Sequence, residues 1–128
     1  MDSSRLAAFP VFADLPAAEL DEVASAVREV EVDAGVTVTT LDDYGASVYF
    51  VEEGEADVLS GDASQALGPG DTFGEIAALL TGERTATVVA RTPMRLLSLS
   101  DQAFQSIRPR VPELEGSLRR LGVERAGR

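Results

Sequence analysis

The sequence contains neither cysteine nor histidine. The absence of cysteine excludes disulfides and thiolate chemistry, and the absence of histidine removes the commonest general base and the commonest metal ligand. Most hydrolase triads and most cupin-type metal sites are therefore excluded. No apolar run approaches the ~20 residues that a membrane-spanning helix needs, and residues 1–5 do not resemble the start of a signal peptide. We expect a cytoplasmic protein.

Basic residues are also scarce. The chain has 11 lysine and arginine residues against 22 aspartate and glutamate residues, which gives a formal net charge of −11. A surface of that sign repels nucleic acid and anionic lipid, so we expect neither nucleic acid nor membrane as a partner of this domain. An anionic ligand would have to be captured by local geometry, because the overall field opposes its approach.

The length of 128 residues fits one domain with a single core, and a hydrophobic content of 45% supports a folded globule. We therefore expect a single domain over 1–128. Its expected parts are an N-terminal helical lead-in over 1–29, a β-barrel over 30–99 and C-terminal helices over 100–128.

Apolar residues at helical spacing predict a helix over about 16–29, and the acidic residues at 19–22 are expected to face solvent. A helical period returns after Ser100, which is a candidate N-cap. A last helix is expected over 113–124. Its apolar stripe is formed by Leu114, Leu118 and Leu121.

Between these helices the apolar residues alternate with a period of two, and turns rich in glycine separate the runs. Many short strands of this kind predict a β-sandwich or barrel. The expected strands are 30–32, 36–40, 47–52, 56–59, 65–67, 85–90 and 94–98. The aromatic residues expected in the core are Tyr49, Phe50, Phe73 and Phe104.

The segment Phe73–Thr87 carries the candidate chemistry. Gly74 lets the backbone approach a ligand, and residues 75–80 can form one helical turn. The first N–H groups of such a turn, at Ile76 and Ala77, lack internal partners and can face an anion.

Two charged side chains make the segment more specific. Arg84 can neutralise a phosphate with a forked pair of hydrogen bonds, and Thr85 adds a hydroxyl beside it. Glu75 accepts hydrogen bonds, so it suits a sugar hydroxyl. A phosphate and a ribose hydroxyl held within one short loop indicate a nucleotide with a compact, cyclic phosphate.

These residues resemble the phosphate-binding cassette of the cyclic-nucleotide-binding domain family, which includes kinase regulatory subunits, catabolite-activator-type regulators and channels. The resemblance rests on the ordered motifs Phe73–Ala77 and Arg84–Thr87, supported by Tyr49–Val51 and by Leu67–Asp71. It covers nearly the whole chain, and the C-terminal half is most similar to the cytoplasmic domain of a bacterial cyclic-nucleotide-regulated potassium channel. The resemblance implies an eight-stranded jelly-roll or β-barrel, a short cassette helix, and C-terminal hinge and lid helices.

The resemblance also implies roles for individual residues. Arg84 would bind the cyclic phosphate, and Glu75 would bind the ribose 2′-hydroxyl. Backbone groups would come from Gly74, Ile76 and Ala77.

Three further residues are carried over. Thr85 occupies a position where a hydroxyl can favour cyclic GMP without excluding cyclic AMP. Leu121 and Arg125 fall in the helix that resembles the lid. The implied protein is a sensor of cyclic AMP or cyclic GMP, without metal or cofactor. Closure of its last helix would signal to an effector such as a channel, an enzyme or another domain.

Two positions depart from the family pattern: Glu83 replaces the usual proline, and Ala78 replaces a larger leucine. They leave open a degenerate domain that mediates protein interaction without binding nucleotide. On residue types alone, Arg84 and Glu75 could also form a simple surface ion pair. A cupin-like enzyme is disfavoured by the lack of histidine. No constellation of nucleophile and base indicates catalysis, and no helix-turn-helix indicates a DNA-binding regulator.

Overall fold

The computed structural model describes residues 1–39, 47–60, 63–74 and 87–126. The helices within these ranges are, in chain order, η1 (Ser3–Arg5), η2 (Pro10–Phe12), α1 (Ala17–Ala26), α2 (Asp101–Ile107), η4 (Arg108–Arg110) and α3 (Pro112–Ala126). The strands are β1 (Arg28–Val32), β2 (Thr37–Thr39), β3 (Val48–Glu53), β4 (Ala56–Ser60), β5 (Ala63–Leu67), β6 (Thr72–Phe73), β7 (Thr87–Ala90) and β8 (Met94–Leu99).

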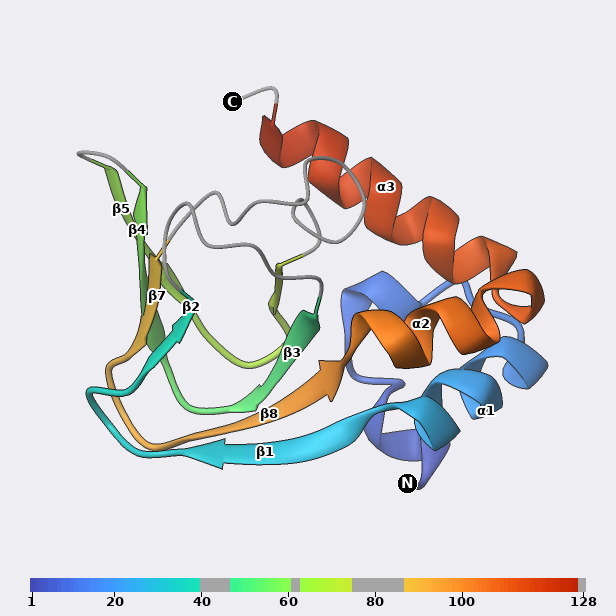
Figure 1. Cartoon of the computed structure of the whole chain (residues 1–128), viewed down its shortest axis with the longest axis horizontal. Coiled ribbons are helices and arrows are strands. Elements are labelled where there is room, and N and C mark those ends of the chain that lie inside the picture. Colours follow the sequence, from blue (N-terminus) through green and yellow to red (C-terminus); the bar gives the residue numbers. More distant parts are fainter. Residues whose placement is uncertain (40–46, 61–62, 75–86, 127–128) are drawn as a thin grey trace.

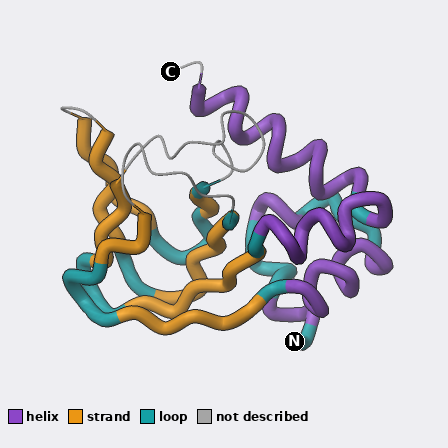
Figure 2. The backbone as a smooth tube through the Cα atoms, in the orientation of Figure 1, coloured by secondary structure: helices purple, strands orange, loops and turns teal. Residues whose placement is uncertain are grey.

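The strands form two antiparallel sheets of four strands each, in the orders β1-β8-β3-β6 and β2-β7-β4-β5. The helices gather at one end of these sheets, and α3 runs from that end back toward the barrel (Figures 1 and 2). The predicted fold class, mainly β with flanking helices, is therefore confirmed. No helix in the described ranges has both the length and the apolar character required to cross a membrane.

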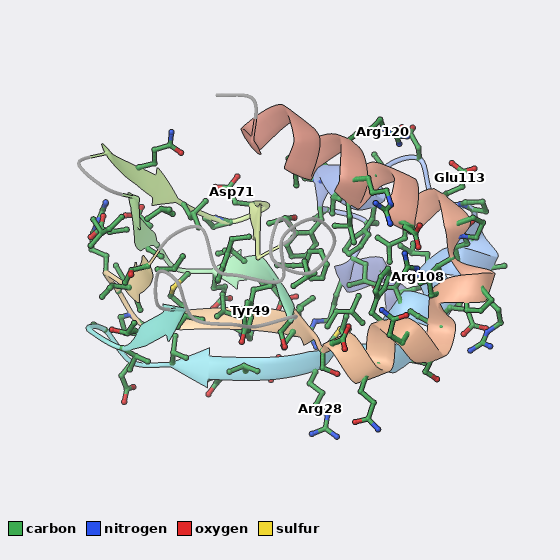
Figure 3. All side chains as sticks on the ribbon, turned by 45° about the horizontal axis from the view of Figure 1, so that its top comes forward. Arg28, Tyr49, Asp71, Arg108, Glu113 and Arg120 are labelled. Carbon is green, nitrogen blue, oxygen red and sulfur yellow. The ribbon has the colours of Figure 1, made fainter. Side chains whose placement is uncertain are left out.

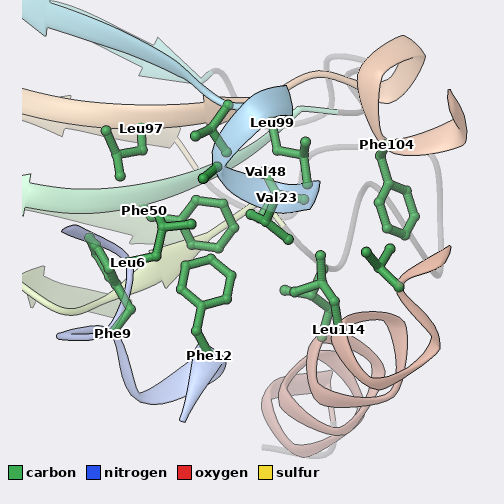
Figure 4. Close-up of a cluster of buried hydrophobic side chains, with 14 of the residues drawn as sticks. Leu6, Phe9, Phe12, Val23, Val48, Phe50, Leu97, Leu99, Phe104 and Leu114 are labelled. Carbon is green, nitrogen blue, oxygen red and sulfur yellow. The ribbon is translucent and has the colours of Figure 1, made fainter. Parts of the chain in front are cut away.

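Strands β3 and β8 present apolar side chains on both faces. Phe50 lies opposite Leu97 and points toward the helices, whereas the next pair, Val51 and Leu96, points into the barrel. Side chains on the first face pack against the N-terminal segment Leu6–Phe12 and against α1, α2 and α3, in what we call the helical-end cluster (Figure 4). Its buried members are Leu6, Phe9, Phe12, Val23, Ala24, Val27, Val48, Phe50, Leu97, Leu99, Phe104, Ile107, Val111, Leu114 and Leu118.

The opposite face forms a second core, here called the barrel-interior cluster. Its buried members are Val51, Ala56, Leu67, Phe73, Val88, Ala90, Met94 and Leu96. Partly buried side chains pack against them, namely Val30, Val32, Val38, Tyr49 and Val58. The predicted core aromatics are confirmed, with Tyr49 half-buried and Phe50, Phe73 and Phe104 buried.

The predicted N-terminal helix is too long at its C-terminal end. It stops at Ala26, and Val27 is already extended, with φ −79° and ψ 154°. Residues 28–32 all pair with β8, so the ladder hydrogen bonds and the alternation of this segment favour strand over a further helical turn. The N-cap position of α1 is Pro16, which makes no side-chain capping bond.

The C-terminal helices agree better with the sequence. The predicted cap at Ser100 is confirmed, because its hydroxyl accepts a hydrogen bond of 3.1 Å from the Ala103 N–H. Helix α3 covers the predicted 113–124 and begins one residue earlier, at Pro112. Proline suits the first turn of a helix because the N–H that it lacks has no partner there. Leu114 and Leu118 are fully buried, and Leu121 is half-buried.

Candidate functional site

A tight turn leads the chain into the candidate site. Gly68, Pro69, Gly70 and Asp71 form it, with a hydrogen bond from the Asp71 N–H to the Gly68 carbonyl and a φ of 94° at Gly70. Proline second and a positive-φ glycine third are typical of a type II turn. The Asp71 carboxylate accepts a hydrogen bond of 2.8 Å from the Gly68 N–H, which closes the turn from the other side.

This turn is hydrogen-bonded to β3, an inner strand of the sheet that β6 joins. The Gly70 N–H donates to the Val51 carbonyl at 2.9 Å, and the Val51 N–H donates to the Asp71 carbonyl at 2.8 Å. Figure 3 shows Asp71 beside the short strand β6, which pairs with β3 through Thr72 and Phe73. The position of β6, too short to be predicted from alternation, is thus set by the turn and by β3.

Gly74 follows β6 directly and has a φ of 91°, a conformation that favours glycine. Beyond it lie residues 75–86, outside the described ranges, and the chain then resumes as β7 at Thr87. Strand β6 belongs to one sheet and β7 to the other. The predicted cassette therefore begins on one sheet and ends on the opposite one.

The barrel wall next to Gly74 is aromatic and apolar. The rings of Tyr49 and Phe73 stack with centroids 5.0 Å apart and an interplanar angle of 19°. On the other sheet, Val58 of β4 lies directly opposite Val88 of β7. These side chains belong to the barrel-interior cluster or pack against it, so both ends of the cassette emerge from the same apolar lining.

The structure describes few of the predicted site residues. Gly74 lies at the end of β6, and Leu121 lies half-buried in α3. The backbone of Arg125 belongs to α3, but its side chain is outside the described set. The residues predicted to bind the ligand through the cassette lie outside the described ranges, together with the two departures from the family pattern. They are Glu75, Ile76, Ala77, Ala78, Glu83, Arg84 and Thr85.

A cavity of about 790 Å³ lies elsewhere, between the end of α1, β8 and α2. Its lining includes Arg28, Ser98, Gln102 and Arg110, and none of its lining residues belongs to the barrel-interior cluster. Arg28 points away from the sheets (Figure 3). The cavity lining includes neither Gly74 nor Leu121, the predicted site residues that the structure describes. Within the described residues, no group of three acidic or other ligating side chains could hold a metal ion.

The outer face of the β1-β8-β3-β6 sheet carries an ion-pair network. Arg5 of η1 binds both carboxylate oxygens of Glu52, at 3.0 Å and 2.5 Å, and also reaches Glu29 at 2.6 Å. Arg95 binds Glu52 at 2.6 Å. The hydrogen bond from Arg5, with a smaller effect from Arg95, holds the pKa of Glu52 below its ordinary value. This network fastens the N-terminal segment to the sheet.

One acidic residue contradicts the predicted solvent face of α1. Glu19 is buried, with 7% of its surface exposed, and its carboxylate accepts hydrogen bonds from the backbone N–H groups of Glu113 and Leu114. An analysis of helical periodicity assigns a charged residue to the exposed face, so it did not predict that Glu19 is buried. The sequence did hold one indication, at the start of α3. The apolar Val111 stands there at the position where a capping side chain is usual, so the first turn of α3 needs an acceptor from another element.

Comparison with known proteins adds independent information on the whole chain. Residues 29–110 match the model of the family described as the cyclic nucleotide-binding domain. The chain is 36% identical over 122 residues to a cyclic nucleotide-gated potassium channel of Rhizobium etli, covering 95% of this chain and 34% of the channel. It is 34% identical over 114 residues to a cAMP-dependent protein kinase regulatory subunit of Colletotrichum orbiculare, covering 87% of this chain and 28% of that subunit.

Solved structures agree with these sequence relatives. The fold superposes on the regulatory domain of Toxoplasma gondii PKA, crystallised with cAMP, with a TM-score of 0.81 and 26% identity. That match covers 98% of this chain and 48% of the other. The chain spans about a third of the length of the channel and kinase relatives reported above. Because the family model matches well over half of the sequence and includes the whole segment 73–87, the chain belongs to the cyclic nucleotide-binding domain family.

Proposed function

We propose that this domain is a sensor that binds a cyclic purine nucleotide between the cassette and α3. The observation that carries the proposal is the family match over residues 29–110, which includes both Glu75 and Arg84 in their expected order and spacing. The described framework supports it, because the chain enters the cassette at Gly74 and leaves it at Thr87 from facing sheets of one barrel.

The roles proposed for the cassette follow from charge. Arg84 neutralises the cyclic phosphate, and the backbone groups of Gly74, Ile76 and Ala77 add hydrogen bonds to it. Glu75 accepts a hydrogen bond from the ribose 2′-hydroxyl. Since the net charge of −11 opposes the binding of an anion, removal of the one guanidinium in the cassette should greatly reduce the affinity for the nucleotide.

Cyclic AMP is the first ligand to test, because two of the similar proteins are described by their dependence on it or their complex with it. Thr85 keeps cyclic GMP as a competitor, since its hydroxyl can contact the guanine amino group. Ligand binding would shift the population of α3 toward a closed position over the base, with Leu121 and Arg125 in the closing segment. The output would pass to an effector module such as a channel or an enzyme, in the cytoplasm.

The decisive experiment is titration calorimetry with cyclic AMP and cyclic GMP. We expect micromolar binding of at least one nucleotide by the unmodified chain and no measurable binding by Arg84→Ala. Arg91→Ala is the matched control, because Arg91 is 45% exposed and pairs with Glu55 and Asp57 on the surface. Absence of heat from both nucleotides at high concentration would refute the sensor and favour the interaction-module alternative, which the departures Ala78 and Glu83 motivate.

Glu75→Ala tests the ribose contact separately. We expect weaker binding by about 1–3 kcal/mol, the usual loss when a hydrogen bond to a charged group is removed. The comparison ligand is the 2′-deoxy form of the nucleotide, which lacks the hydroxyl that Glu75 is proposed to bind. The variant should bind the two ligands equally, whereas the unmodified chain should prefer the ribose form. An unchanged affinity for the ribose form would refute this assignment.

A further inference from the structure

The first turn of α3 has no capping side chain of its own. The preceding residue, Val111, is apolar and cannot accept a hydrogen bond through its side chain. Pro112 has no N–H, and the Glu115 N–H already donates to the Val111 carbonyl at 3.1 Å. This leaves the N–H groups of Glu113 and Leu114 as the two donors at this helix end that need a partner from elsewhere.

Glu19 of α1 supplies that partner from far away in the sequence. One of its carboxylate oxygens accepts from the Glu113 N–H at 3.0 Å and from the Leu114 N–H at 3.2 Å. No ion pair involves Glu19 within the described part of the chain, although its neighbour Glu22 pairs with Arg110 at 3.1 Å. The buried negative charge is therefore balanced by the two peptide N–H groups and by the positive end of the α3 dipole.

The same two helices contribute side chains to one buried cluster. Leu114 and Leu118 of α3 are fully buried in the helical-end cluster together with Val23 and Ala24 of α1. Figure 3 places Glu113 at the beginning of α3, at the end of the molecule away from β4 and β5. A hydrogen-bonded cap thus holds the first turn of α3 to α1, and both helices contribute side chains to one apolar cluster, while α3 continues back toward the barrel.

We propose that Glu19 is a positioning residue that locks the first turn of α3 to α1, so that the two move as one body when nucleotide binds. The inference rests on the proposed function in one respect, because α3 is the helix expected to respond to the ligand. Its structural consequence is that a rearrangement of α3 is delivered to the N-terminal helix. Without the Glu19 carboxylate, α3 can shift while α1 stays in place.

The lock is tested first without nucleotide, by residue-resolved amide hydrogen exchange. Glu19→Leu keeps the site filled and apolar but removes the acceptor, and we expect exchange at Glu113 and Leu114 to rise about tenfold, the usual scale of a lost cap. Glu19→Gln retains an acceptor oxygen and should restore most of the protection. Glu22→Leu, one turn further along α1, removes the partly exposed ion pair with Arg110 and should leave the exchange of both amides unchanged.

Unchanged exchange at both amides in Glu19→Leu, or an equal rise in Glu22→Leu, would overturn the lock. Glu19→Ala replaces the leucine variant if the latter does not fold. Since this measurement uses no ligand, it decides the contact between Glu19 and α3 even if the chain binds no nucleotide at all.

The coupled movement is tested with spin labels, which the absence of native cysteine makes straightforward. Labels at Asp21 of α1 and Arg120 of α3, both exposed, report the distance between the helices. We expect cyclic AMP to leave this distance unchanged in the otherwise unmodified chain and to change it in Glu19→Leu. A nucleotide-induced change in the chain that retains Glu19 would refute movement as one body.

Discussion

The helical-end and barrel-interior clusters share strands β3 and β8 but differ in composition and in the way the chain supplies them. The helical-end cluster is rich in large side chains, among them Phe9, Phe12, Phe50 and Phe104, and draws on both ends of the described chain. The barrel-interior cluster is built from strands alone and relies on smaller side chains such as Ala56, Val88 and Ala90, with partly buried valines around them.

This difference separates two tasks. The helical end is filled by side chains that interlock, as in an ordinary protein core, so it fixes the mutual positions of α1, α2 and the start of α3. The barrel interior presents half-buried apolar surface beside the two ends of the cassette, which is what a bound purine nucleotide would use. We therefore expect substitutions at the helical end to reduce stability and substitutions in the barrel to alter binding.

The largest effect is expected at Phe50. Its ring is fully buried and lies 6.0 Å from the Phe9 ring and 4.8 Å from the Phe12 ring, measured between centroids. Phe50→Ala should lower the free energy of unfolding by about 3–5 kcal/mol, because it removes a large buried side chain and leaves a cavity. Urea denaturation measures the loss. The fraction that remains folded should bind nucleotide with nearly unchanged affinity, and a loss of affinity as large as the loss of stability would erase the distinction between the clusters.

A smaller stability effect, but a larger binding effect, is expected at Val58. This side chain is half-buried in the barrel and lies opposite Val88, the first residue after the cassette. Val58→Ala should lower the free energy of unfolding by only about 1 kcal/mol, because two partly exposed methyl groups are lost. Its affinity for cyclic AMP, measured by calorimetry, should change more than that of Phe50→Ala. Equal affinities in the two variants would show that the barrel wall at Val58 does not contact the ligand.

The sequence predicted most of the strands and helices that form the two clusters, but not the contacts between segments that are distant in the chain. The strands predicted over 47–52 and 94–98 and the cap at Ser100 are local patterns, and each appears in the structure as expected. Pairing partners are not local. The early end of α1 depends on β8, and the burial of Glu19 depends on two amides more than ninety residues away. The periodicity of residue types along the sequence carries no information about contacts between such distant residues.

At the candidate site, too, the local motif could be predicted from the sequence but its long-range attachment could not. The motif of Gly74, Glu75 and Arg84 predicted the family from the order of residue types, because the proposed contacts with phosphate and hydroxyl would require those types at a fixed spacing. The motif says nothing about what anchors it. The anchor is the hydrogen-bonded turn before β6 and its attachment to Val51 of β3, which only the paired strands reveal.

The smallest effect is expected at the outer ion-pair network, which lies on the helical-end face of the sheet but outside the packed cluster. Arg5→Ala should destabilise the chain only slightly, since exposed ion pairs contribute little.

The effect of Arg5→Ala on stability should depend on pH. The pKa of Glu52 is held below the ordinary value of 4.5, chiefly by Arg5, so the stabilisation is present above that value and is lost as the pH falls through the lowered pKa. Thermal unfolding of the two proteins should therefore differ most near neutral pH and converge under acidic conditions. Asp21→Ala, at an exposed position of α1 outside the network, is the control that should show no such convergence. A difference that stays constant from neutral to acidic pH would mean that Arg5 acts through packing of η1 and not through its charge.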